Sequence, residues 1–169
     1  MNHTKTKAPF RYDIVGSFLR PAALMKTREA YAAGNAGAEE LRAAEDAAIR
    51  DLVAKEKEVG LRAVTDGEFR RRYWHLDFLA ALGGVEEVGA SHWSVAFKGA
   101  QPKAETVKIV DKVDFGAHPF LDHFRFLNDL AGDAVAKMTI PSPSMLHLIC
   151  CVRATDYAPI PRYENEDAL

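Results

Sequence analysis

The spacing of apolar and polar residues predicts a series of helices. Apolar side chains recur at three- and four-residue steps over residues 38–59, charged side chains cover the other faces, and Gly60 follows as a helix-ending residue. Residues 22–33 predict a helix that ends at a glycine-rich break. Another helical pattern begins at residues 118–119 and carries large apolar side chains on one side.

Short apolar runs predict three strands, at residues 14–15, 61–66 and 137–140, and each run ends in small or polar residues. A strand, a long helix and a second strand form a parallel βαβ unit with a right-handed crossover. The ends of the first two strands, at Gly16-Ser17 and at Asp66-Gly67-Glu68, should therefore lie at one edge of the sheet. The fold class that this order indicates is α/β.

The middle of the chain departs from this order. A helical pattern over residues 75–82 ends at Gly83-Gly84. Residues 91–97 and 106–113 then alternate between apolar and polar positions around a loop at residues 98–102. We interpret them as a β-hairpin-like insertion.

Composition and charge narrow the class of protein. At 169 residues, of which 48% are hydrophobic and 27% charged, the chain is long enough for one domain with a core of its own. The formal net charge of −2 and the lack of a basic stripe argue against nucleic acid as a partner. Because no signal-peptide pattern and no apolar run of membrane-spanning length occur, we expect a cytoplasmic protein without a membrane partner.

The two cysteines, Cys150 and Cys151, are adjacent and follow closely after His147. Together these residues make only a weak metal cluster, because zinc sites usually draw three or four ligands from more than one segment. Buried free thiols are the favoured interpretation of the cysteines.

The first two strand ends carry groups that could hold an amino acid. Asp66 and Glu68 offer carboxylates to a substrate ammonium group, which needs an acceptor at a fixed position. Ser17 and the backbone around Gly16 offer hydroxyl and N–H donors to a substrate carboxylate. Four arginines could hold an acidic second substrate: Arg20, Arg70, Arg71 and Arg72. The alternative interpretation is an ordinary Asp-Gly turn followed by solvated arginines.

A series of motifs extends this pattern through nearly the whole chain. In order they are Val15-Gly16-Ser17-Phe18-Leu19-Arg20-Pro21, Thr65-Asp66-Gly67-Glu68-Phe69-Arg70-Arg71, Trp74-His75-Leu76-Asp77-Phe78, Phe97-Lys98-Gly99 and Thr139-Ile140-Pro141-Ser142-Pro143-Ser144-Met145-Leu146. With these motifs the chain resembles the cobalamin-independent methionine synthase family. The likeness is to its short, single-barrel members, the 5-methyltetrahydropteroyltriglutamate–homocysteine methyltransferase-like proteins.

The resemblance implies both a fold and a site. The fold is a partial TIM (β/α)₈ barrel, about the first three strands with a hairpin-like insertion, because a complete barrel needs about 250 residues. Residues 1–169 would form a single incomplete barrel domain, the N-terminal part of a uroporphyrinogen decarboxylase/methionine synthase-like catalytic domain. In the family, the residues that match Gly16, Ser17 and Glu68 hold the amino-acid part of homocysteine or methionine. Asp66 and Arg20 complete the set of substrate-binding residues that we expect.

The family's chemistry, as the resemblance implies it, transfers a methyl group from a folate to a homocysteine thiolate held on zinc, which lowers the pKa of the thiol. The family's zinc ligands, a His, two Cys and a Glu, lie in the second half of the barrel, and neither Cys150 nor Cys151 matches them. We therefore expect zinc and a folate-type donor in the complete enzyme. This chain would carry the amino-acid-binding part, with no metal ligand and no catalytic residue, and would be inactive alone. Coenzyme M alkyl transfer and uroporphyrinogen decarboxylation, known on related barrels, fit the motifs less well.

A non-catalytic half-barrel is the alternative hypothesis. Such a protein would bind a small ligand, or would form a homo-oligomer through the open edge of its sheet, because uncovered strand edges and apolar faces favour association. Stabilisation by methionine or homocysteine separates the two hypotheses, since the amino-acid clamp requires Glu68.

Overall fold

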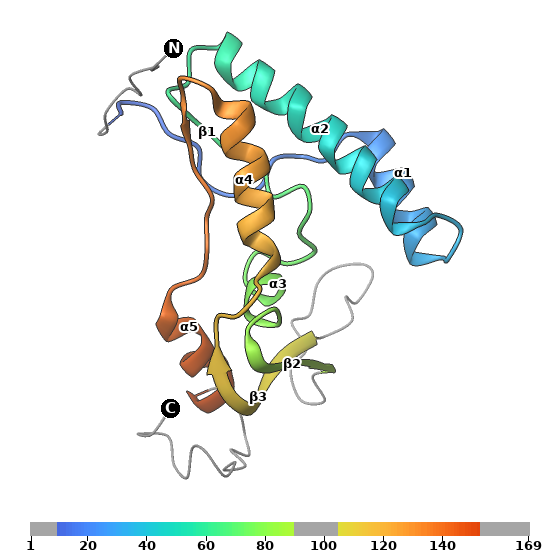
Figure 1. The fold of residues 1–169 in the computed structure, drawn as a ribbon, viewed down its shortest axis with the longest axis vertical. Helices are drawn as coiled ribbons and strands as arrows, with labels where there is room; N and C mark the ends of the chain where they lie inside the picture. The colour runs from blue at the N-terminus through green and yellow to red at the C-terminus, as the bar shows by residue number, and fades with distance from the viewer. Residues whose placement is uncertain (1–9, 90–104, 153–169) are drawn as a thin grey trace, which may run out of the picture. The chain divides into compact units, whose positions relative to one another are not determined.

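The computed structural model describes residues 10–89 and 105–152 and shows a mixed α/β chain (Figure 1). The chain divides into two compact units. The first contains the residues up to Arg71 together with Phe120–Thr139, and the second contains Arg72–Pro119 and residues from Ile140 onward. The predicted α/β class is confirmed. In the described residues the strands form two two-stranded sheets and no closed barrel.

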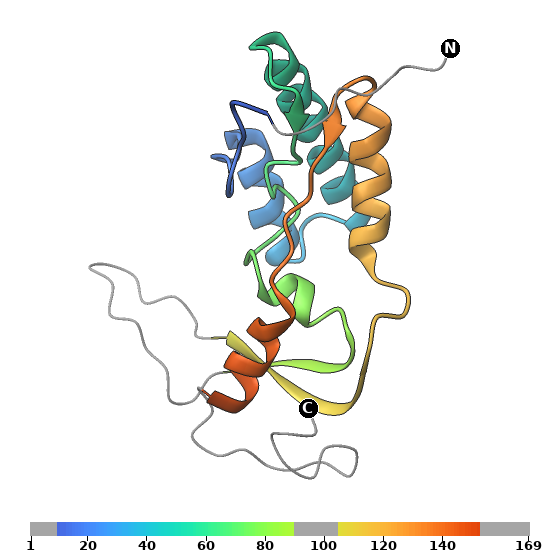
Figure 2. The same ribbon diagram turned by 90° about the vertical axis from the view of Figure 1, so that its left-hand side faces the viewer.

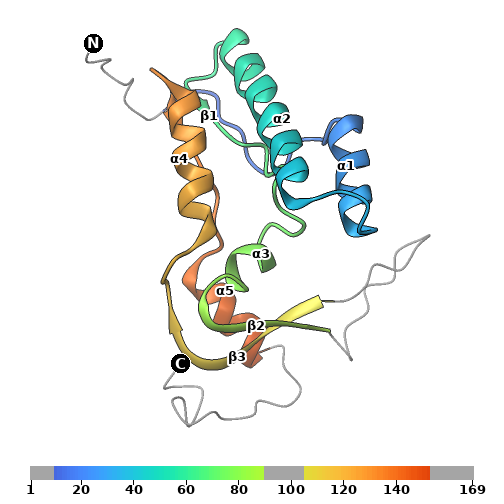
Figure 3. The ribbon, with the colours of Figure 1, turned by 45° about the vertical axis from the view of Figure 1, so that its right-hand side comes forward.

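The first unit packs three helices with a short parallel strand pair. Side chains from the helices and from β1 bury a common apolar core, in which Leu24, Ile49 and Leu127 are at most 1% exposed. Figures 1 and 3 show α2 and α4 side by side, and both contribute to this core. The elements of the unit are α1 (Ala22–Ala32), α2 (Ala38–Glu58), β1 (Ala63–Val64), α4 (Pro119–Ala131) and β4 (Val135–Ala136).

The ends of α2, a helix of 21 residues, show why it begins and ends where it does. Acidic residues stand in its first turn and basic residues in its last, so their charges complement the helix dipole. Gly60 then adopts a left-handed conformation (φ +86°), which suits the end of a helix. The helices predicted over residues 22–33 and 38–59 are confirmed, as is the helix that begins near residue 118. None of the helices in the described ranges has the length and apolar character needed to cross a bilayer.

The parallel pairing of β1 and β4 positions the candidate site. The register places Ala63 opposite Val135 and Val64 opposite Ala136. The ladder continues one residue further, because the N–H of Lys137 donates to the carbonyl of Val64 at 2.9 Å. Parallel strands end at the same edge, so the turn at residues 65–71 lies beside residues 137–139. The strand predicted at residues 137–140 is thus found two residues earlier, as β4.

The strand predicted at residues 14–15 does not form as regular structure. Gly16 takes φ +85°, which interrupts the extended backbone that a ladder requires. Val15 is 86% exposed, so its side chain does not pack against the apolar core of the unit. The segment is joined to the turn after β1 where the N–H of Phe18 donates to the carbonyl of Gly67 (3.1 Å).

The second unit is built on an antiparallel hairpin of β2 and β3 (Figure 2). Its elements are α3 (Leu76–Leu79), β2 (Gly83–Gly89), β3 (Glu105–Asp114), α5 (Pro143–His147) and the π-helical turn η1 (Leu148–Val152). The strand register shifts between Gly83 and Val85, and a Cβ on Gly84 would collide with the carbonyl oxygens of Lys112 and Asp111. These glycines therefore make a bulge inside the hairpin, where the sequence pattern had predicted the end of a helix.

Several boundaries in the second unit differ from those predicted. The helix predicted over residues 75–82 is the shorter α3, because the chain enters the hairpin at Gly83. The strand predicted at residues 106–113 is confirmed within β3, whereas residues 91–97 and the loop at 98–102 lie outside the described residues. α5 begins at Pro143, in a stretch that the sequence pattern assigned only to the end of a strand.

A glycine in the turn after β1 provides a test of this fold. A Cβ on Gly67 (φ +63°) would lie 2.5 Å from the Leu52 side chain in the core, whereas a Cβ on Gly34 (φ +76°) would meet nothing within 4 Å. We expect Gly67→Ala to lower the free energy of unfolding by about 2–4 kcal/mol, from overpacking added to left-handed strain. Gly34→Ala, with strain alone, should lower it by about 1 kcal/mol. Urea unfolding followed by circular dichroism measures both; equal losses would contradict the packing of the turn against α2.

Candidate functional site

A strained turn follows β1 and carries the carboxylate of Glu68. Gly67 (φ +63°) and Glu68 (φ +57°) are both left-handed, and Glu68 is the only non-glycine residue with positive φ in the described ranges. The side chain of Asp66 supports the turn, because its Oδ1 accepts from the N–H of Glu68 at 3.0 Å. A left-handed residue of this kind persists only where its surroundings determine it, and such residues gather at functional sites.

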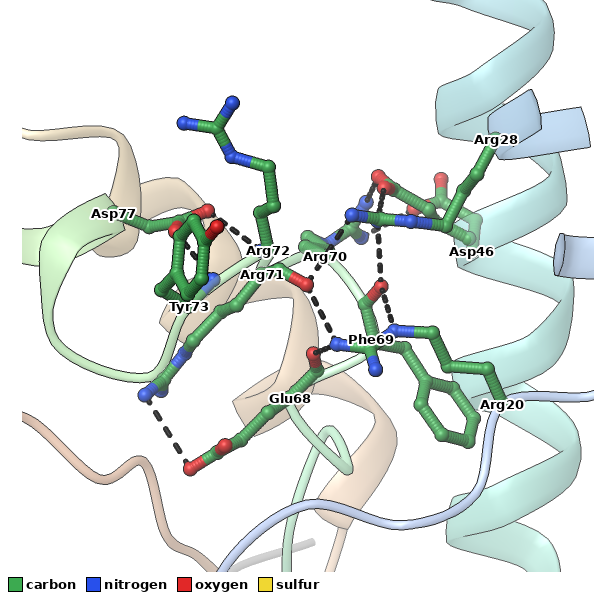
Figure 4. A network of polar contacts seen from close by, with 11 residues as sticks. Arg20, Arg28, Asp46, Glu68, Phe69, Arg70, Arg71, Arg72, Tyr73 and Asp77 are labelled. Atoms are coloured by element: carbon green, nitrogen blue, oxygen red, sulfur yellow. Dashed lines mark hydrogen bonds and ion pairs between the residues drawn. The ribbon is translucent and has the colours of Figure 1, made fainter. Parts of the chain in front are cut away.

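Two arginines hold the backbone of this turn. Arg20 donates to the carbonyl oxygens of Glu68 (2.9 Å), Phe69 (3.4 Å) and Arg71 (2.6 Å). Arg28, on α1, donates to those of Phe69 (3.0 Å) and Arg71 (3.2 Å). Figure 4 shows both guanidinium groups at the carbonyls of the turn, while the side chain of Glu68 points away from Arg20 toward the guanidinium of Arg71. The turn conformation is thus fixed by charge-assisted hydrogen bonds to its own peptide groups.

Glu68 is 6% exposed, and its carboxylate accepts hydrogen bonds from three separate segments. The hydroxyl of Ser17 donates to Oε2. The hydroxyl of Thr139 donates to Oε1 at 2.7 Å, and the guanidinium of Arg71 lies 3.5 Å from the same oxygen. Residues far apart in the chain therefore converge on one carboxylate at the ends of the parallel strands.

These contacts set the charge of Glu68. Burial on its own would raise the pKa of this carboxyl group. The hydrogen bonds from Ser17 and Thr139, with the positive charges of Arg71 and Arg20, outweigh burial and lower the pKa of Glu68 below its ordinary value. Glu68 is consequently an anion at neutral pH, suited to accept hydrogen bonds from a small cation.

The structure brings together some of the residues predicted for the site and places others in supporting positions. Ser17 and Glu68, predicted for opposite sides of an amino-acid ligand, are hydrogen-bonded to each other. Gly16 is next to Ser17, and neither N–H of this pair has an acceptor among the described residues. Asp66 supports the turn, and Arg20 is bound to backbone carbonyls, so the structure gives both a structural position.

Thr139 is the site residue that the sequence analysis missed. It lies at the end of the third predicted strand, among hydroxyl-bearing residues, and that position was the available signal. Nothing in the sequence pattern distinguishes it from Ser142 or Ser144, whose hydroxyls instead lie 2.8 Å from each other.

The arginines considered for an acidic second substrate all have partners within the chain. Arg70 pairs with Glu45 (3.2 Å) and with Asp46, and its guanidinium lies 5.0 Å from the ring centroid of Phe126. In the second unit, Arg72 pairs with two glutamates of the hairpin, Glu87 and Glu105. Most arginines of this run therefore form ion pairs within the chain. Glu68 is better suited than they are to bind a charged ligand.

A half-buried histidine on α4 lies near the same arginines. Burial, together with the positive charges of Arg70, Arg42 and Arg71, lowers the pKa of His123 to about 4. The ring of His123 lies 5.5 Å from that of Phe120. His123 is thus a neutral packing residue at physiological pH.

The described residues do not fit a zinc site. No group of three or more His, Cys, Asp or Glu side chains in these ranges could hold a metal ion. The thiol of Cys150 is buried, and its Sγ lies 3.5 Å from the carbonyl oxygen of Val107. His118 is also buried, with its Nε2 3.0 Å from the carbonyl oxygen of Phe78.

These features define an α/β protein with an ionised, buried glutamate at the carboxyl ends of a parallel strand pair. Comparison with known proteins extends this description. No protein-family model matches the chain. The uncharacterized proteins YxjH and YxjG of Bacillus subtilis (strain 168) are 48% identical over 140 residues and 49% identical over 142 residues. These alignments cover 83% and 84% of the chain but 37% of each relative, so the chain spans little more than a third of their length.

Two solved structures are similar to the chain. The "Putative Vitamin-B12 Independent Methionine Synthase" from Listeria monocytogenes matches with a TM-score of 0.69 and 46% identity, over 85% of the chain and 39% of that protein. The B12-independent methionine synthase from Shewanella sp. W3-18-1, solved in complex with selenomethionine, matches with a TM-score of 0.53 and 22% identity, over 69% of the chain and 33% of that protein, and supports the fold alone. The resemblance to the cobalamin-independent methionine synthase family is thereby confirmed for the part of those proteins that the chain spans.

The low pKa of His123 makes a prediction for the pH dependence of stability. As pH falls from 6.5 to about 4, the unfolded chain takes up a proton on this ring before the folded chain does, so the free energy of unfolding falls in that window. His123→Gln removes this contribution, and its stability should change less with pH between 6.5 and about 4. Urea unfolding at several pH values measures the difference between the two proteins. Identical pH profiles would mean that the ring of His123 is not desolvated in the folded state.

Proposed function

We propose that the chain supplies the amino-acid-binding part of a methyltransferase of the cobalamin-independent methionine synthase type. The observation that carries the proposal is the ionised carboxylate of Glu68, fixed by Ser17, Thr139 and Arg71 at the end of a parallel strand pair. Ligand sites of parallel α/β proteins are built at this edge of the sheet. The 46% identity to the putative vitamin-B12-independent methionine synthase from Listeria monocytogenes supports the choice of this type of enzyme.

The ligand's ammonium group would bind to the Oε2 atom of Glu68. A carboxylate has about four acceptor positions, and Oε1 already takes two donors, whereas among the described residues Oε2 takes only the hydroxyl of Ser17. Ser17 is exposed, so solvent and ligand can reach this side of the carboxylate. The positive charge of the ammonium group would form a charge-assisted hydrogen bond with the buried carboxylate.

The ligand's carboxylate would bind to the segment that contains Gly16 and Ser17. Both N–H groups lack acceptors among the described residues, and a left-handed residue such as Gly16 is a component of the backbone nests that bind anions. The hydroxyl of Ser17 can rotate from Glu68 to this carboxylate. One serine thus stands between the two charged ends of the amino acid.

The rest of the proposal concerns the complete protein. β1 and β4 would be strands of a partial (β/α)₈ barrel, with the segment around Gly16 following their edge, in a cytoplasmic enzyme. The activity would be methyl transfer from a folate-type donor to the thiolate of homocysteine, with zinc supplying the acidity that makes the thiolate. The role proposed for the described residues is to bind and orient the amino-acid end of the substrate.

Self-association is a second candidate function, supported by exposed apolar side chains in the segment before α1. Leu19 is 96% exposed and Val15 is 86% exposed. Exposed large apolar residues close to an open strand pair favour contact with another copy of the chain. This function does not require the charge of Glu68, so one variant separates the two candidates.

Methionine should stabilise the chain through Glu68. At a free methionine concentration ten times Kd, the free energy of unfolding should rise by about 1.4 kcal/mol. Glu68→Gln keeps the shape but removes the charge that accepts from the ammonium group, and it should abolish this gain. Glu86→Gln, an exposed glutamate of β2, is the matched control and should retain it. Thermal unfolding with and without methionine measures the effect; an equal gain in all three proteins would disprove the clamp.

The purified 169-residue chain should retain no stoichiometric zinc after exhaustive dialysis, because the family resemblance implies that the zinc ligands lie in the second half of the barrel, and the described residues offer no ligand cluster. Inductively coupled plasma mass spectrometry measures the metal content. A tightly held, stoichiometric zinc that is lost in Cys150→Ser would show that Cys150 joins a metal site and would overturn this part of the proposal.

A further inference from the structure

Thr139, Arg71 and Glu68 form a closed ring of hydrogen bonds. The Nη2 atom of Arg71 donates to the carbonyl of Thr139 at 2.6 Å, and its Nη1 atom lies 3.3 Å from the Thr139 hydroxyl oxygen. That hydroxyl lies 2.7 Å from Oε1 of Glu68, and Nη1 of Arg71 lies 3.5 Å from the same oxygen. Each member of the ring thus contacts the other two.

The ring fixes the direction of the Thr139 hydroxyl proton. A hydroxyl group has a single proton to donate, while a guanidinium has donors only. Because Arg71 donates toward the Thr139 oxygen, the hydroxyl proton is directed to the carboxylate of Glu68. Because the orientation of the Thr139 hydroxyl is already fixed, its hydrogen bond to Glu68 costs little conformational entropy. This hydrogen bond favours one rotamer of the Glu68 side chain.

Arg71 itself has little freedom to move. It is 3% exposed, its guanidinium lies 4.7 Å from the ring centroid of Phe120, and its carbonyl accepts from both Arg20 and Arg28. Thr139 follows β4, and its place beside the turn results from the parallel pairing of β4 with β1. The ring is therefore supported from both strand ends.

We propose that Thr139 is a positioning residue for Glu68: together with Arg71 it holds the Oε1 side of the carboxylate and so presents the Oε2 side to the ammonium group of an amino-acid ligand. The presentation to an ammonium group rests on the proposed function, whereas the holding of the carboxylate does not. Ser17 and Thr139 then have different tasks, although both donate to Glu68. Ser17 exchanges partners with the ligand, and Thr139 stays in place.

Two variants, one without the hydroxyl and one without the methyl group, test this proposal. Thr139→Val keeps the shape of the side chain and removes the hydroxyl, and Thr139→Ser keeps the hydroxyl. The first measurement, without ligand, is the titration of the Glu68 carboxyl by ¹³C NMR, with the signal assigned from its absence in Glu68→Gln. The second is the Kd for methionine, measured by isothermal titration calorimetry. Circular dichroism monitors folding, and Thr139→Ala replaces the valine variant if that variant fails to fold.

We expect Thr139→Val to raise the pKa of Glu68, because the carboxylate loses a donor, and to weaken methionine binding about tenfold. Thr139→Ser should restore both quantities to near the wild-type values, which a purely packing role of the threonine methyl group would not do. An unchanged titration in Thr139→Val, or equal damage in both variants, would overturn the positioning role. If the titrations behave as expected but the wild-type chain binds no methionine, the positioning role stands and the amino-acid proposal fails.

Discussion

The left-handed conformation of Glu68 is the constraint on which the rest of the site depends. In that conformation the carboxylate projects toward Arg71, and the carbonyl oxygens of the turn are free to accept from Arg20 and Arg28. A buried carboxylate without donors is strongly unfavourable. The parallel pairing of β1 with β4 supplies a donor by bringing Thr139 alongside. Strand pairing and the charges of the arginines therefore jointly determine the conformation and the ionisation of Glu68.

Part of this arrangement could be predicted from sequence and part could not. The sequence patterns predicted that the Gly16-Ser17 and Asp66-Gly67-Glu68 segments lie together, and Ser17 does meet Glu68. The predicted reason, two parallel strands, was wrong: residues 14–15 form no strand, and the segment is joined to the turn by the hydrogen bond from Phe18 to Gly67. The backbone role of Arg20 could not be predicted, since sequence shows a cation but not whether it will find a ligand or a peptide carbonyl. Thr139 is 71 residues from its partner, and strands of 2 residues such as β1 and β4 are too short for an apolar pattern to fix their register.

The same reasoning explains where the fold prediction succeeded and where it did not. Long helices such as α2 repeat their pattern many times, so their bounds are well determined by sequence. At Gly83 and Gly84 the local signal fits a helix end or a bulge equally well, and the close approach of the opposite strand decides between them. Family motifs supplied what periodicity could not, and the 46% identity to the Listeria structure supports that use of the motifs.

The hold of Arg20 and Arg28 on peptide carbonyls has a consequence for the robustness of the turn. Guanidinium groups remain protonated in proteins, and peptide oxygens do not titrate. The contacts that the two arginines make to the turn therefore do not depend on pH, whereas the anionic character of Glu68 does. Acidification would thus neutralise Glu68 while leaving the arginine contacts to the turn in place.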